Sequence, residues 1–125
     1  MVGFMTTLFD AVGGTAYFER LVDDFYHRVE GDPVLRPLYP EDLGPSRWRT
    51  CMFLVQYWGG PTTYSDERGH PRLRMRHFPF RIGSVERDAW LKHMVGAVSQ
   101  SGVAPELEAM MVDYFERSST AMINS

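Results

Sequence analysis

Cysteine is almost absent from this chain, because Cys51 is the only one among 125 residues. A single thiol excludes an internal disulfide and any zinc site that needs several thiolates. No apolar run approaches the roughly 20 residues that a membrane-spanning helix requires. The first residues hold no basic region followed by an apolar stretch. We therefore predict no secretory signal and expect a cytoplasmic protein.

Low-complexity tracts, internal repeats and linker-like segments are also missing, which predicts a single domain over residues 1–125. A chain of this length can bury a hydrophobic core without disulfides or metals to support it. Its apolar share of 44% and charged share of 23% are ordinary for a soluble globular protein. The formal net charge of -3 argues against general binding of nucleic acid.

Positive charge nevertheless gathers around the segment "RLRMRHFPFRIG", residues 72–83, and no acidic residue lies between Arg68 and Val85. Five of the thirteen basic residues belong to this region: Arg68, Arg72, Arg74, Arg76 and Arg81. Local charge of this kind suits a small anionic partner, such as a carboxylate or phosphate group, better than a long polyanion. A solvated arginine-rich loop explains the charges alone equally well.

Apolar residues recur at steps of three and four along most of the chain, which is the period of an α-helix. Five helices are predicted: over residues 7–12, from 15 to about 30, from about 46 to 58, and two more that begin at 84 and 105. A single helical turn is predicted at 73–76. The proline-rich residues 33–45 predict a corner with at most short helical turns, and residues 61–71 predict a loop. The predicted fold class is all-α.

Two local features refine this prediction near the arginine-rich segment. Pro79 is expected to push Phe78 out of the helical region, because the proline ring clashes with the preceding residue there. Ser84 is expected to cap the next helix, since its hydroxyl can accept a hydrogen bond from a free backbone N–H group.

Three large amphipathic side chains fall where core residues are expected, namely Tyr26, Tyr39 and Trp90. Each carries a polar atom that needs a partner when it is buried. A backbone carbonyl or water is the ordinary partner, and a group that is not protein is the other. His77 is likewise open to two interpretations, because a lone histidine is either structural or solvent-exposed, or it is a metal ligand.

Longer stretches of the sequence resemble one family closely. The stretches are "FYHRV", "PVLRPLYPEDL", "MFLVQYWGGPTTYSDERGHPRLRMRHFPFRIG" and "ERDAWL". They are similar to the group II truncated hemoglobins, the lineage of truncated hemoglobin O. The resemblance runs from "FDAVGG" to the last predicted helix.

The resemblance implies a truncated globin, in which a two-over-two helical sandwich encloses heme. The heme is expected to be the non-covalent b type, because the chain has no C-x-x-C-H motif. By motif position, His77 corresponds to the iron ligand. Trp90, Tyr26 and Tyr39 correspond to polar residues around the bound ligand and are the candidate catalytic residues.

Further positions match residues that contact the cofactor. These are Arg49, Tyr57 and Arg76 as candidates for the heme propionates, with Phe53, Thr50 and Trp90 along the pocket. The segment "LGPSRWRTCMFL" departs from the family pattern, and it places Ser46 and Thr50 where small and aliphatic residues are usual. Thr50 is therefore expected to add a hydroxyl near the ligand and make the pocket more polar.

The implied function is binding of dioxygen and other diatomic ligands at a polar pocket. Hydrogen-bond donors around dioxygen slow its release, which argues against oxygen transport and favours chemistry with oxygen, peroxide or nitric oxide, as in a nitric oxide dioxygenase or a peroxidase. The implied partners are dioxygen, carbon monoxide, nitric oxide or peroxide, an external reductase, and a second copy of the chain in a homodimer.

Three alternatives remain open on the sequence alone. The protein is a store, scavenger or sensor of diatomic gas without turnover. Alternatively, residues 68–81 bind RNA or phosphate on a helical domain. A non-heme metal site from His70 and His77 is the third, although their spacing with Pro71 between them does not match a helical pair of ligands.

Overall fold

A computed structural model describes residues 7–125, and every regular element in that range is helical, as predicted. The elements are α1 (Leu8–Val12), α2 (Thr15–Glu30), the 3-10 helix η1 (Arg36–Leu38), α3 (Gly44–Tyr57), α4 (Thr63–Arg68), α5 (Leu73–His77), α6 (Ser84–Gln100) and α7 (Pro105–Ala121). Within residues 7–125, no helix is both long and apolar enough to cross a membrane.

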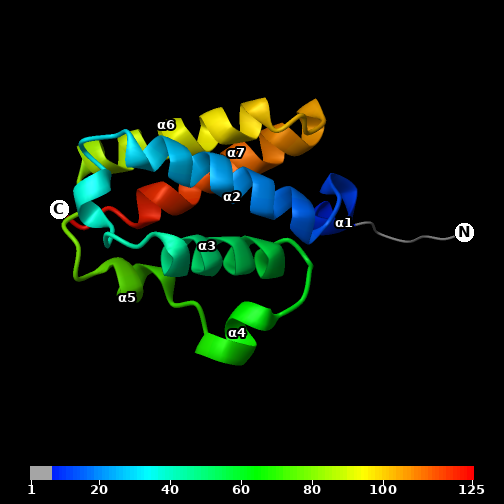
Figure 1. Ribbon diagram of the computed structural model, residues 1–125, viewed down its shortest axis with the longest axis horizontal. Helices are drawn as coiled ribbons and strands as arrows, with labels where there is room; N and C mark the ends of the chain where they lie inside the picture. The colour runs from blue at the N-terminus through cyan, green and yellow to red at the C-terminus, as the bar shows by residue number, and fades with distance from the viewer. Residues whose placement is uncertain (1–6) are drawn as a thin grey trace, which may run out of the picture.

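Helix α2 lies at the centre of the packing, because its whole apolar stripe is buried. The buried residues of the stripe are Phe18, Leu21, Val22, Phe25, Tyr26 and Val29. Full burial of one such side chain contributes about 1.5 to 3 kcal/mol. Helix α2 packs against α3 and α6, and α6 packs against α7 (Figure 1). These helices form the two-over-two sandwich that the resemblance implies.

Paired glycines after α3 allow the short helix α1 to approach closely. Gly59 has a φ of 103°, a backbone conformation that residues with a side chain rarely adopt. A Cβ atom on Gly60 would lie 2.6 Å from the Phe9 ring and 2.8 Å from Val55. The Phe9 amide donates to the Trp58 carbonyl at 3.0 Å. Helix α3 ends at Tyr57, next to the predicted end at 58, and the glycines after it allow the contact with α1.

The prediction of a loop over residues 61–71 is wrong, because α4 forms within it. Six residues are too few to show a helical period, so the sequence pattern carried no signal. The helix is held by tertiary contacts instead. Tyr64 is buried, and the Gln56 side chain donates to the Ser65 hydroxyl at 2.7 Å and accepts from the Ser65 amide at 2.9 Å.

Two further local predictions are wrong. Phe78 keeps helical angles, with φ of -56° and ψ of -37°, despite the following Pro79. The Phe78 amide donates to the Met75 carbonyl at 3.2 Å, which continues the last turn of α5. Gly83, rather than Ser84, is the cap of α6. The Glu86 carboxylate accepts a hydrogen bond from the Gly83 amide at 2.7 Å, so the capping contact comes from within the helix.

Candidate functional site

Helix α5 ends at His77 and fixes the orientation of its ring. The Nδ1 atom of His77 lies 2.6 Å from the Leu73 carbonyl oxygen, one helical turn earlier. A carbonyl can only accept a hydrogen bond, so Nδ1 carries the proton in the neutral ring. The Nε2 atom then presents its lone pair. An imidazole held in this way is prepared to bind a metal ion through Nε2.

Helix α5 lies apart from the packed core. In Figure 1, α4 and α5 form the lower edge of the molecule, and α5 is not among the closely packed helix pairs of the described residues. Large apolar side chains of α5 and of the segment after it stay exposed: Met75 by 58%, Phe78 by 76%, Phe80 by 46% and, in the first turn of α6, Val85 by 61%. So much exposed apolar surface in one region marks a binding site.

Across the core, Tyr26 forms a polar cluster with the first turns of α3. Its hydroxyl lies 2.8 Å from the Thr50 hydroxyl and donates to the Ser46 carbonyl at 3.2 Å. Burial raises the pKa of Tyr26, and the Thr50 hydrogen bond opposes that rise. The Tyr26 proton is therefore already engaged by protein. The Thr50 hydroxyl contacts Tyr26, and its role toward a bound ligand stays a prediction.

Tyr39 and Trp90 complete this polar cluster from η1 and α6. The ring of Tyr39 meets the edge of the Tyr26 ring, with centroids 5.7 Å apart. Burial and the neighbouring Tyr26 raise the pKa of Tyr39, and the Trp90 side chain opposes the rise through a hydrogen bond. The indole N–H of Trp90 can only donate. A Tyr39 oxygen that accepts from Trp90 keeps its own proton for another acceptor.

The structure thus brings Tyr26, Tyr39, Trp90 and Thr50 into one cluster. Phe25 connects it to the core, because its ring lies 5.1 Å from Tyr26 and 5.4 Å from Trp90 between centroids. The second aromatic group lies farther along α3. Tyr57 stacks on Tyr114 at 4.2 Å and on Phe53 at 5.9 Å between ring centroids. Burial raises the pKa of Tyr114 to about 12.

The candidate arginines have structural partners already. The Nε atom of Arg76 donates to the Pro71 carbonyl at 2.8 Å, and Nη2 donates to the Arg68 carbonyl at 3.1 Å. Arg49 donates to the Ser46 hydroxyl at 3.2 Å. Both side chains are half-buried. Arg76 therefore holds the α4–α5 connection, and its role toward an anionic group stays a prediction.

The comparison with protein families places these features in one context. The model of the bacterial-like globin family matches residues 7–124. The chain belongs to this family. The globin is 40% identical to the group 2 truncated hemoglobin YjbI of Bacillus subtilis over 111 residues, which cover 89% of this chain and 84% of that protein. The resemblance to group II truncated hemoglobins is confirmed.

Solved structures agree with the family. The globin superposes on the hemoglobin of Chloroflexus aurantiacus with a TM-score of 0.95 and 52% identity, over 97% of this chain and 100% of that chain. It superposes on the hemoglobin of Thermobifida fusca with a TM-score of 0.93 and 54% identity, over 95% of this chain and 98% of that chain. Family membership implies globin-type binding of small gaseous ligands at a heme.

The residues present fit a heme. The free Nε2 of His77 is suited to an iron ion, and the exposed apolar side chains around α5 are suited to a flat apolar ring. The Nδ1 atom of His70 is occupied, because it accepts from the Arg72 amide at 3.0 Å. In residues 7–125, no group of three histidine, cysteine or acidic side chains is arranged for a metal ion.

Two contributors to the site were not predicted from the sequence. The Leu73 carbonyl orients His77, and its signal was the i, i-4 spacing within α5. Asn124 contacts the turn after His77. That pairing spans 47 residues between Asn124 and His77, so no local pattern reveals it.

Proposed function

We propose that the protein binds heme b through His77 and holds dioxygen and other diatomic ligands beside the Tyr26, Tyr39 and Trp90 cluster. The observation that carries the proposal is the orientation of the His77 ring, whose Nδ1 is hydrogen-bonded to the Leu73 carbonyl at 2.6 Å. A fixed neutral ring presents Nε2 in one direction. When bound, heme supplies an iron ion that takes small ligands and exchanges electrons.

The chain's own residues then set what the pocket does. Trp90 donates through its indole N–H, and Tyr39 holds a proton at its hydroxyl, because burial raises its pKa. Both groups stabilise negative charge that develops on a ligand. Tyr26 has a supporting role, because its hydroxyl already forms hydrogen bonds with Thr50 and Ser46. A cluster of hydrogen-bond donors of this kind slows the release of bound dioxygen.

Retention favours redox chemistry over delivery of oxygen. We propose reactions with oxygen, peroxide or nitric oxide, in which an external reductase returns the electrons. The candidates for propionate contacts remain Arg49, Arg76 and Tyr57, and Phe53 lies beside Tyr57 in the same group. A store or sensor of gas without turnover is the second candidate, because the same cluster serves both functions.

The purified protein, reconstituted with heme, tests the proposal. We expect one heme per chain, a Soret band and the pyridine hemochrome spectrum of heme b. Turnover of nitric oxide or peroxide with a chemical reductant would distinguish a redox protein from one that stores or senses gas without turnover. A chain that stays colourless after reconstitution, and that binds polyanions with a steep salt dependence, would instead support the arginine-rich segment as an RNA or phosphate site.

A further inference from the structure

The segment after α7 contacts the turn that follows His77. In Figure 1, the end marked C lies beside the chain that joins α5 to α6. The Asn124 side chain accepts from the Ile82 amide at 2.8 Å and donates to the Phe80 carbonyl at 2.8 Å. It also donates to the His77 carbonyl at 3.4 Å. The Asn124 amide donates to the Ile82 carbonyl at 2.8 Å.

These contacts need a primary amide. Asparagine offers an acceptor oxygen and two N–H donors in one small planar group. The turn presents the opposite set, with an amide at Ile82 and carbonyls at Phe80 and His77. Aspartate would keep the acceptor and lose both donors. Alanine would lose the complete side-chain contact.

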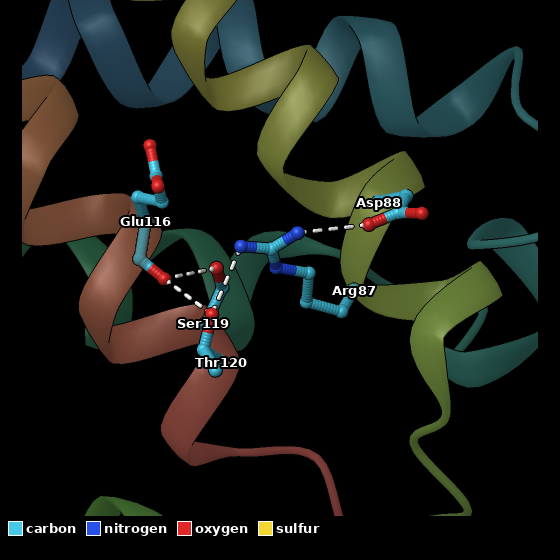
Figure 2. A network of polar contacts seen from close by, with 5 residues as sticks. All are labelled: Arg87, Asp88, Glu116, Ser119 and Thr120. Atoms are coloured by element: carbon cyan, nitrogen blue, oxygen red, sulfur yellow. Dashed lines mark hydrogen bonds and ion pairs between the residues drawn. The ribbon is translucent and has the colours of Figure 1, made fainter.

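The end of α7 is itself fastened to α6, which gives Asn124 a defined position. Figure 2 shows Arg87 of α6 reaching Thr120 of α7, and its Nη2 donates to the Thr120 hydroxyl at 2.9 Å. Nη1 of the same guanidinium lies 3.0 Å from the Asp88 carboxylate. The Thr120 hydroxyl also donates to the Glu116 carbonyl at 2.8 Å. Asn124 therefore extends from an anchored helix end.

We propose that Asn124 is a positioning residue for His77. It closes residues 77–82 into one conformation, in which Phe78 stays helical before Pro79, and it thereby sets the place and tilt of the imidazole. The inference rests on the proposed role of His77 as iron ligand. Asn124 acts through the backbone of the turn and does not contact the cofactor.

The first test uses the protein without heme, so it is independent of the iron site. Exchange of the Ile82 amide with deuterium is measured by NMR in Asn124→Ala, Asn124→Asp and the wild type. We expect exchange to be roughly three- to tenfold faster in Asn124→Ala, the range for loss of one net hydrogen bond. Asn124→Asp keeps the acceptor and should retain part of the protection. Ser125→Ala is the matched control, because its hydroxyl contacts Arg81 instead.

The second test uses the reconstituted protein. In both Asn124 variants we expect heme loss to accelerate by roughly three- to tenfold, by the same reasoning on one net hydrogen bond. The iron–histidine stretching band of the ferrous protein should shift or broaden in both variants. Ser125→Ala should match the wild type in both measurements. The stretching band reports the imidazole itself, so a general loss of stability would not move it.

Two results would overturn the proposal. Unchanged exchange of the Ile82 amide in Asn124→Ala means that the contact does not form in solution. Faster exchange with an unchanged stretching band means that Asn124 only stabilises the turn. If Asn124→Ala does not fold, as judged by circular dichroism, the same readouts on Asn124→Asp decide. Retention of a normal stretching band in His77→Ala would instead refute the proposed iron ligand, which is a separate failure.

Discussion

At the scale of single residues, the three polar aromatic side chains of the cluster have different freedom to donate. The Tyr26 hydroxyl is occupied by Thr50 and Ser46. Trp90 lies beside Tyr39. Burial raises the pKa of Tyr39, and the hydrogen bond from Trp90 lowers it in part. We propose Tyr39, which keeps its own hydroxyl proton, and Trp90, whose single N–H would turn from the Tyr39 oxygen to the ligand, as the leading donors. The sequence alone predicted Trp90 as a donor and left Tyr39 and Tyr26 as alternatives for the second.

We predict that Trp90→Phe accelerates release of dioxygen by roughly ten- to a hundredfold. The change keeps an aromatic ring and removes the N–H donor. A hydrogen bond to a charged acceptor contributes about 1.5 to 3 kcal/mol, and about 1.4 kcal/mol corresponds to tenfold. Tyr39 compensates in part, so the lower end of the range is expected. Stopped-flow dissociation of dioxygen provides the measurement.

Carbon monoxide and Tyr26→Phe are the controls for this prediction. Carbon monoxide carries less negative charge when bound, so its release should change less than that of dioxygen. Tyr26→Phe should have a smaller effect than Trp90→Phe on dioxygen, because the Tyr26 proton already binds within the protein. Equal acceleration of both gases would mean that Trp90 only fills space.

At the scale of elements, a hydrogen bond between Asp32 and His93 joins the corner that carries Tyr39 to α6. His93 Nε2 lies 2.5 Å from the Asp32 carboxylate, and each side chain is only 15% exposed. The other Asp32 oxygen accepts from the Val34 amide at 2.7 Å and the Leu35 amide at 3.1 Å. The His93 hydrogen bond lowers the pKa of Asp32, and the backbone amides add to this effect.

We predict that Asp32→Asn lowers the free energy of unfolding at pH 7 by about 1.5 to 3 kcal/mol, the range for hydrogen bonds to a charged group. Because the folded pKa of Asp32 is lowered, its contribution is complete above the ordinary carboxyl pKa of 3.8 and is lost as the pH falls through the lowered value. The difference between wild type and variant, measured by urea unfolding, should therefore shrink between about pH 5 and pH 2.

Asp113→Asn is the matched control for Asp32→Asn. Asp113 pairs with Arg117 at 2.9 Å, but both side chains are about two-thirds exposed, at 67% and 66%. Exposed pairs contribute at most about 1 kcal/mol. If Asp32→Asn changes stability no more than this control does, the corner is held by other contacts.

The elements also show where sequence reasoning succeeds. Helix α2 was predictable because six core residues repeat its period over sixteen residues. The short helix α4 was not, because its stability comes from Tyr64 burial and the Gln56–Ser65 contacts rather than from a pattern. Phe78 shows the same limit. A residue before proline does favour extended backbone angles. At Phe78, hydrogen bonds of the surrounding turn outweigh this preference and keep the angles helical.

At the scale of the whole molecule, the packed helices α2, α3, α6 and α7 form the core, and α5 lies outside it. The resemblance identified the candidate site residues, and the structure brings four of them, Tyr26, Tyr39, Thr50 and Trp90, into one cluster. Contacts between distant segments were beyond the sequence. Asn124 and Ile82 are 42 residues apart, and Asp32 and His93 are 61 apart. Such pairs are set by tertiary packing, which leaves no periodic signal.

We propose that His77 alone among the four histidines holds the iron. The most direct measurement is heme binding by His77→Ala, followed by its absorption spectrum with and without added imidazole. We predict that His77→Ala loses most of its heme affinity or regains a normal spectrum only with imidazole, whereas alanine at His27, His70 or His93 leaves the heme in place. Loss of heme from His93→Ala, together with a normal spectrum in His77→Ala, would contradict the account.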